Sequence, residues 1–173
     1  APTRLKPSVK TSPRTKQVYA TLADGRYAIG AAALARSLAR VAHAPLLVLH
    51  TDAEIFRVSA RLPNVILRRV DAIPNPHSHG QPRFSHTFTK LRVFELLEFE
   101  RIVYIDADCV VRQNIDELFE GHDFLAAPDW GIHLCDQFNS GLFAFSPSPQ
   151  LAAKVLSELP SSVSSDGGDQ GHL

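Results

Sequence analysis

Residues 101–108 read Arg-Ile-Val-Tyr-Ile-Asp-Ala-Asp, an apolar run that ends in two carboxylates. A short apolar run of this kind predicts a strand that is covered on both faces of a sheet. Because alternate side chains of an extended chain point the same way, we expect Asp106 and Asp108 to lean to one side. Two carboxylates at a strand's carboxyl end can hold one hard divalent cation and, through it, a diphosphate. The segment therefore predicts a metal–phosphate site.

Strand-like and helix-like segments alternate along the rest of the chain. We expect strands at residues 17–22, 46–50, 65–70, 102–105, 124–127 and 142–145, and helices at 30–43, 54–61, 88–97, 115–119 and 150–159. Residues 73–83 hold three prolines and predict a loop. This alternation predicts a three-layer α/β domain with a mostly parallel sheet. Ligands of such sheets sit outside the carboxyl ends of the strands, where Asp106 and Asp108 are expected.

Bulk composition narrows the class of protein. The chain has 173 residues, of which 45% are hydrophobic, so it predicts one domain, or most of one, with a real core. Its formal net charge is zero, which argues against nucleic acid as the main partner. Two cysteines, Cys109 and Cys135, do not make a disulfide framework, so a reducing compartment, or no constraint on the compartment at all, is the simpler interpretation.

The two ends of the chain suggest a fragment of a longer protein. Residues 1–16 carry five basic residues, three prolines and no acid, which predicts a disordered basic tail or a linker to an anchor. The sequence begins with Ala1, lacks methionine and stops without terminating turn chemistry. We therefore expect a catalytic domain over residues 17–173 that is incomplete at its C-terminus. Its location would be cytoplasmic, or in the Golgi if the parent chain carries an N-terminal anchor.

The Asp106–Asp108 pair alone leaves other interpretations open. A haloacid-dehalogenase-type phosphatase also places Asp-x-Asp after a hydrophobic strand, and Asp106 would then be its nucleophile. Against this, that motif normally follows the first strand, whereas several strand–helix units precede it here. A third interpretation is simply two solvated carboxylates, because short motifs match by chance.

Two later segments favour the metal–phosphate interpretation. Residues 138–145 (FNSGLFAF) read as a small polar turn that enters a buried strand. Residues 166–171 (DGGDQG) place paired glycines beside a carboxylate and an amide, so a ligand could approach the backbone closely. Taken singly, these segments are also typical of an ordinary strand entry and of a helix-start loop with an aspartate cap.

In this order, the three segments resemble glycosyltransferase family 8, in particular its glycogenin-like members. The resemblance runs from about Val18 to Leu173 and includes VYATL, Tyr27, Gly30 and Lys90. It implies a GT-A (Rossmann-like) fold, a UDP-sugar donor, Mn²⁺ as cofactor and transfer with retention at the anomeric carbon. It also implies a hexose, with glucose ahead of galactose and glucuronic acid, a hydroxyl acceptor on a glycan, protein or small molecule, and a homodimer.

The resemblance assigns roles to individual residues. It implies that Asp106 and Asp108 bind Mn²⁺, that Tyr27 stacks on uracil, and that Lys90 and Arg83 bring positive charge to the donor. The remaining donor-binding residues would be Leu22, Ala107, Asn139, Ser140, Gly141 and Asp166.

Catalysis is assigned to Asp169, Gln170 and Lys90. Asp169 would be the nucleophile of a double displacement. In a front-side transfer it would only stabilise the oxocarbenium-like charge. The resemblance does not separate these two mechanisms.

One departure from the family keeps a non-enzymatic alternative open. The family's downstream His-x-x-Gly-x-x-Lys-Pro-Trp block, which supplies the third metal ligand and a lysine for the phosphates, does not occur in this sequence. A nucleotide-sugar-binding domain that has lost catalysis is therefore the third hypothesis, beside the transferase and the phosphatase.

Overall fold

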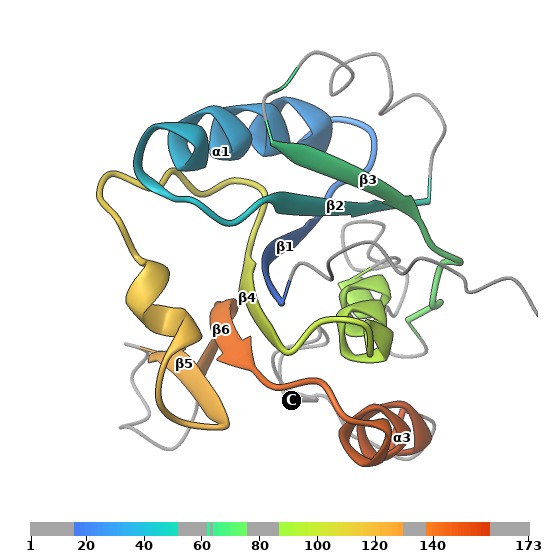
Figure 1. The fold of residues 1–173 in the computed structure, drawn as a ribbon. Coiled ribbons are helices and arrows are strands. Elements are labelled where there is room, and N and C mark those ends of the chain that lie inside the picture. Colours follow the sequence, from blue (N-terminus) through green and yellow to red (C-terminus); the bar gives the residue numbers. More distant parts are fainter. Residues whose placement is uncertain (1–15, 52–61, 63, 76–86, 130–137, 160–173) are drawn as a thin grey trace, which may run out of the picture.

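The computed structural model describes residues 16–51, 62, 64–75, 87–129 and 138–159. Within them a six-stranded sheet has the order β3-β2-β1-β4-β6-β5 (Figure 1). The strands are β1 (Gln17–Leu22), β2 (Leu46–His50), β3 (Val65–Arg69), β4 (Arg101–Ile105), β5 (Phe124–Pro128) and β6 (Phe138–Phe145). The first four strands in this order pair in parallel, whereas β6 pairs antiparallel with both β4 and β5. The predicted mostly parallel α/β sheet is confirmed.

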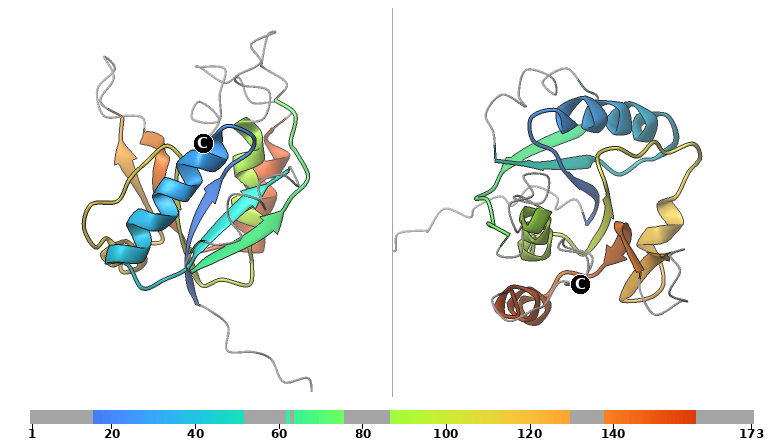
Figure 2. Two further views of the ribbon diagram at one scale, coloured as in Figure 1. Left: turned by 90° about the horizontal axis from the view of Figure 1, so that it is seen from above. Right: turned by 180° about the vertical axis from the view of Figure 1, so that it is seen from behind.

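Helices cover both faces of the sheet and make three layers. Helix α1 (Tyr27–Val41) lies on one face, and η2 (Thr87–Glu95) and α3 (Pro149–Ser157) lie on the other (Figures 1 and 2). A short turn of 3₁₀ helix, η3 (Asp116–Phe119), precedes β5. None of the described helices is long and apolar enough to cross a membrane.

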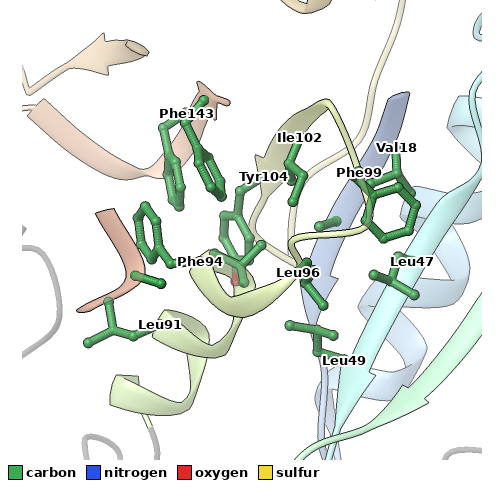
Figure 3. Close-up of a cluster of buried hydrophobic side chains, with 14 of the residues drawn as sticks. Val18, Leu47, Leu49, Leu91, Phe94, Leu96, Phe99, Ile102, Tyr104 and Phe143 are labelled. Carbon is green, nitrogen blue, oxygen red and sulfur yellow. The ribbon is translucent and has the colours of Figure 1, made fainter. Parts of the chain in front are cut away.

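Strand alternation sends neighbouring side chains into two separate cores. In β4, Ile102 and Tyr104 join the cluster under η2 and α3, whereas Val103 and Ile105 join the cluster under α1. All five β4 residues are buried, as expected for a strand with helices on both sides. Figure 3 shows Tyr104 among Phe94, Leu96 and Phe143 in the first cluster.

The predicted helix at 88–97 differs in type from the expectation. Residues 87–95 form a 3₁₀ helix, and the residue expected to extend it, Leu97, is 48% exposed and lies beyond its end. The apolar residues Phe88, Leu91 and Phe94 recur every three residues and are all buried. This spacing matches the three residues per turn of a 3₁₀ helix, so the stripe stays aligned with the core.

Two boundaries also differ from the prediction. Helix α1 begins at Tyr27 instead of Gly30, because the preceding turn winds directly into it: the Tyr27 amide donates to the Asp24 carbonyl (3.0 Å). Strand β6 begins at Phe138, so residues 139–141 lie within the strand and not in a turn before it. The expected helix at 54–61 and most of the expected loop at 73–83 fall outside the described residues.

Candidate active site

Asp106 and Asp108 stand where β4 ends, at the same sheet edge as the carboxyl ends of its parallel neighbour β1 and of β2, which pairs with β1. The strand stops at Ile105, and the Cys109 amide donates to the Asp106 carbonyl (3.1 Å), which closes a turn. Both aspartates thus lie beyond the strand, in the turn. Ala107 between them is buried, whereas Asp106 is half-buried and Asp108 is exposed, and the expectation that the two carboxylates lean to one side stays a prediction.

A buried lysine links this turn to two other elements. The Lys90 Nζ atom of η2 lies 3.1 Å from Asp106 Oδ1 and donates to the Ser140 carbonyl and Oγ, each at 3.2 Å. It also lies 5.1 Å from the centre of the Tyr104 ring. The Lys90 side chain is 8% exposed and that of Asp106 is 37% exposed. Since a buried charge needs compensation, Lys90 holds the end of β4 and the middle of β6 to η2.

Gly141 lets β6 approach the Asp106 carboxylate closely. A Cβ atom at position 141 would lie 2.8 Å from Asn139 Oδ1 and 3.0 Å from Asp106 Oδ2. The Gly141 amide donates to Asn139 Oδ1 (2.8 Å), and its carbonyl accepts from the Asp106 amide (2.8 Å). The expected group of Asn139, Ser140 and Gly141 is thus brought to the Asp106 turn.

An irregularity in β6 shapes the same place. The partner of β5 changes from Phe143, opposite Ala126, to Asn139, opposite Ala127. Residues between these two partners leave the β5–β6 ladder, as in the bulges that redirect strands near active sites. The bulge puts Ser140 against Lys90 at a position that strand alternation does not predict.

Tyr27 opens α1, which follows the carboxyl end of β1. Its side chain is 46% exposed, and the Arg26 guanidinium lies 5.2 Å from the centre of its ring. Leu22, the last residue of β1, is half-buried against the core. The tyrosine ring is therefore accessible at the edge where the Asp106 turn also stands.

Asp24 is a structural residue of this edge that the sequence analysis missed. Its carboxylate accepts from both the Thr51 amide (2.7 Å) and the Thr51 hydroxyl (2.8 Å), which ties the turn before α1 to the end of β2. Gly25 follows it with a φ of +51°. The Asp-Gly pair is typical of a turn and predicts this one, but no local pattern indicates the hydrogen bonds to Thr51.

Cys109 follows the two aspartates in the turn. Burial raises the pKa of its thiol, and the charges of Asp108 and Asp106 raise it further, while Lys90 acts in the opposite direction. The thiol therefore stays protonated near neutral pH, which argues against Cys109 as a nucleophile.

The described residues contain only part of the expected site. No group of three or more His, Cys, Asp or Glu residues there could hold a metal ion. Arg83, Asp166, Asp169 and Gln170 lie outside the described residues.

Comparison with known proteins shows extended sequence similarity. Rabbit (Oryctolagus cuniculus) Glycogenin-1 is 33% identical over 168 residues, which are 92% of this chain and 50% of the relative. Human Glycogenin-2 is 42% identical over 93 residues, or 54% of this chain and 18% of that protein. UDP-glucuronate:xylan alpha-glucuronosyltransferase 2 of Arabidopsis thaliana is 29% identical over 176 residues, or 99% of this chain and 28% of that protein. The chain thus spans half or less of these relatives, and no protein-family model matches it.

Solved structures share the fold. The glycosyltransferase GlyE of Streptococcus pneumoniae superimposes with a TM-score of 0.65 at 19% identity, over 91% of this chain and 42% of that one. The galactosyltransferase LgtC, solved with donor and acceptor sugar analogues, gives a TM-score of 0.59 at 19% identity, over 75% of this chain and 57% of that one. These similarities confirm the GT-A fold. The sequence relatives support a glycogenin-like member of glycosyltransferase family 8, and the solved structures show the fold.

Proposed function

We propose that the chain is the donor-binding part of a retaining glycosyltransferase. It would move a hexose, with glucose as the first candidate, from a UDP-sugar to a hydroxyl acceptor in the presence of Mn²⁺. The observation that carries this proposal is the cluster of Lys90, Asp106 and Ser140 at the carboxyl edge of the sheet, beside the accessible ring of Tyr27. Such an edge is where α/β folds bind nucleotides.

The donor set suits a hard divalent cation. The Asp106 side chain is 37% exposed, and Asp108 is exposed. Carboxylate oxygens are ligands that Mn²⁺ prefers, and a bound ion would act as a Lewis acid on the diphosphate. Asp106 and Asp108 would hold the ion. Two carboxylates fill only part of its coordination shell, so the donor and other groups would supply the remaining ligands.

The protein's own residues would orient the donor around this point. The Tyr27 ring would stack on uracil, which buries an aromatic face that is otherwise in solvent. Lys90 would add positive charge near the diphosphate and fix the Asp106 carboxylate in place. Asn139, Ser140 and Gly141 would face the donor sugar.

The reacting residues of the proposal are Asp169 and Gln170, beside Asp166 and Arg83, none of which lies in the described part of the chain. Asp169 would act as nucleophile or as a stabiliser of positive charge at the anomeric carbon. A homodimer and the identity of the acceptor stay predictions from the family resemblance.

The phosphatase alternative is not favoured. The similar proteins named above are glycogenins and glycosyltransferases, and Asp106 stands after the fourth strand of the chain. In addition, its Oδ1 atom is engaged by a buried ammonium, which weakens a carboxylate as a nucleophile.

Calorimetric titration of the protein with UDP, UDP-glucose, UDP-galactose and UDP-glucuronic acid, with and without Mn²⁺, tests the proposal. We expect binding that requires the metal, with UDP-glucose the tightest of the sugars. Asp108→Asn should abolish the metal-dependent part, while the control Glu117→Gln, an exposed residue of η3, should leave it unchanged. Metal-independent binding, or unchanged binding by Asp108→Asn, would contradict the proposed site.

A further inference from the structure

Helix α1 and the segment after β4, residues 106–114, are fastened together along their length. Both Figure 1 and the rear view in Figure 2 show this segment leaving β4 and passing beside α1 on its way to η3. The segment begins with the Asp106–Asp108 turn, and the helix begins with Tyr27. The two parts of the proposed donor site thus stand at the starts of two elements that run side by side.

The first fastening point is a backbone approach that only glycine permits. A Cβ atom at Gly30, in the first turn of α1, would lie 2.4 Å from the Ala107 carbonyl oxygen and 3.1 Å from its carbon. Both are backbone atoms, so they cannot turn aside as a flexible side chain could. Any larger residue at position 30 must push the helix and the Asp106–Asp108 turn apart.

Two hydrogen-bonded points follow further along. Ser37 Oγ accepts from the Val111 amide (3.0 Å) while it donates to the Leu34 carbonyl (2.8 Å). Asn114 Nδ2 donates to the Val41 carbonyl at the end of the helix (2.7 Å). The order of contacts is the same in both elements, so they lie alongside each other in register from end to end.

We propose that Gly30 is a positioning residue that sets the distance between the base-binding ring of Tyr27 and the carboxylates of Asp106 and Asp108. This inference rests on the proposed function. A nucleoside diphosphate would span both groups, because its base would meet Tyr27 and its phosphates would meet the metal held by the carboxylates. A ligand that touches only one end does not depend on that distance.

The experiment compares UDP, which would contact both Tyr27 and the metal held by the carboxylates, with uridine, which would contact only Tyr27. The dissociation constants of UDP with Mn²⁺ and of uridine are measured for the wild type, for Gly30→Ala and for the control Ala33→Ser, an exposed α1 position. Because a displacement of about 1 Å costs up to about 100-fold in a positioned site, we expect Gly30→Ala to weaken UDP about 10- to 100-fold. Uridine should change less than about twofold on the same grounds.

Helix propensity works against this expectation, which sharpens the test. Alanine is a better helix former than glycine, so Gly30→Ala would strengthen α1 if no contact opposed it. A loss of UDP affinity by this variant therefore points to the approach at Ala107. Ala33→Ser, which adds an atom on the exposed side of the same helix, should bind both ligands as the wild type does.

A second variant keeps the test decisive if Gly30→Ala does not fold. Ser37→Ala removes the acceptor for the Val111 amide without adding any atom, and we expect it to weaken UDP about threefold while uridine is unaffected, since one hydrogen bond is worth about that much. Unchanged UDP affinity in the variants that fold, or an equal loss for UDP and uridine, would overturn the positioning role alone. Failure of the wild type to bind UDP with Mn²⁺ would overturn the proposed function itself, and the inference with it.

Discussion

Asp106 and Asp116 are two aspartates of one stretch of chain, and each is held by a buried residue, yet their surroundings differ. Asp116 Oδ1 accepts from the Tyr19 hydroxyl (2.6 Å) and its Oδ2 accepts from Asn114 Nδ2 (2.9 Å). Asp106 Oδ1 pairs with Lys90, and its Oδ2 faces the position where Gly141 lacks a side chain. Protein groups engage both oxygens of Asp116, whereas the Asp106 side chain is 37% exposed and stands beside the exposed Asp108.

The electrostatics of Asp116 are those of a structural contact. Burial would raise the pKa of its carboxyl, but hydrogen bonds from Tyr19 and Asn114 outweigh burial and hold the pKa below its usual range. Burial, and then the bond to Asp116, raise the pKa of the Tyr19 phenol well above its ordinary value. The pair therefore stays as phenol and carboxylate at all pH values at which the protein would work. The Asp116 carboxylate therefore stabilises the fold, whereas the partly exposed Asp106 carboxylate is accessible to a ligand.

The largest effect that would test the difference between Asp106 and Asp116 is the loss of UDP affinity when Asp106 is replaced. Loss of a residue that merely supports a metal ligand costs 10- to 100-fold in affinity, so we expect Asp106→Asn to weaken Mn²⁺-dependent UDP binding about 100-fold or more. Titration calorimetry measures it, and circular dichroism checks that the variant is folded. Binding within a few-fold of the wild type would remove Asp106 from the site.

The counterpart change at Asp116 should affect stability and not binding. Asp116→Ala leaves the buried Tyr19 hydroxyl without its acceptor and removes a charged hydrogen-bond partner, so we expect a loss of about 2–3 kcal/mol in the free energy of unfolding. Urea denaturation measures this loss, with Glu117→Ala on the exposed side of η3 as the matched control. If Asp116→Ala weakened UDP binding as strongly as Asp106→Asn, the distinction between the two aspartates would fail.

A smaller effect on stability is expected from a change at Tyr19, whose hydroxyl donates to Asp116. Tyr19→Phe keeps the buried ring against Phe119, whose centre lies 4.8 Å away, and removes only the hydroxyl. One hydrogen bond to a charged group is worth about 1.5–2 kcal/mol, which is the expected loss in the free energy of unfolding. In a double-mutant cycle, the variant that carries both Tyr19→Phe and Asp116→Ala should lose much less stability than the sum of the two single losses. Full additivity would show that the two residues do not interact.

The smallest effect concerns pH. Because the pKa of Asp116 is lower in the folded chain than in the unfolded one, its contribution to stability is present above the unfolded pKa of about 3.9 and is lost as the pH falls through the folded pKa. The stability difference between wild type and Tyr19→Phe should therefore shrink by about 1 kcal/mol on acidification from pH 6 to below pH 3. Urea denaturation at several pH values measures it. A difference that grows on acidification would have the wrong sign for this pair.

Local pattern was enough to predict the strands and the overall class of the fold. Strands β2 and β4 are short, largely apolar runs that are buried throughout, and short runs that alternate with helical segments have few other ways to bury their side chains. The place of Asp106 and Asp108 at the end of β4 followed from the same pattern. The family resemblance added Lys90, Tyr27 and residues 139–141 as site residues, and the described structure brings Lys90, Ser140 and Gly141 to Asp106.

Contacts between distant residues had no local signal. Lys90 and Ser140 are 50 positions apart, and Asp24 and Thr51 are 27 apart, so no periodicity relates them. The register shift at which Ser140 leaves the β5–β6 ladder lies between Ala126 and Ala127 of β5, and no local pattern marks it. Local sequence fixes which side of a strand or helix is apolar, because that depends on the period of the backbone. Which polar groups meet depends on how the packed elements come together, and here that packing brought a buried lysine to one aspartate and a buried tyrosine to the other.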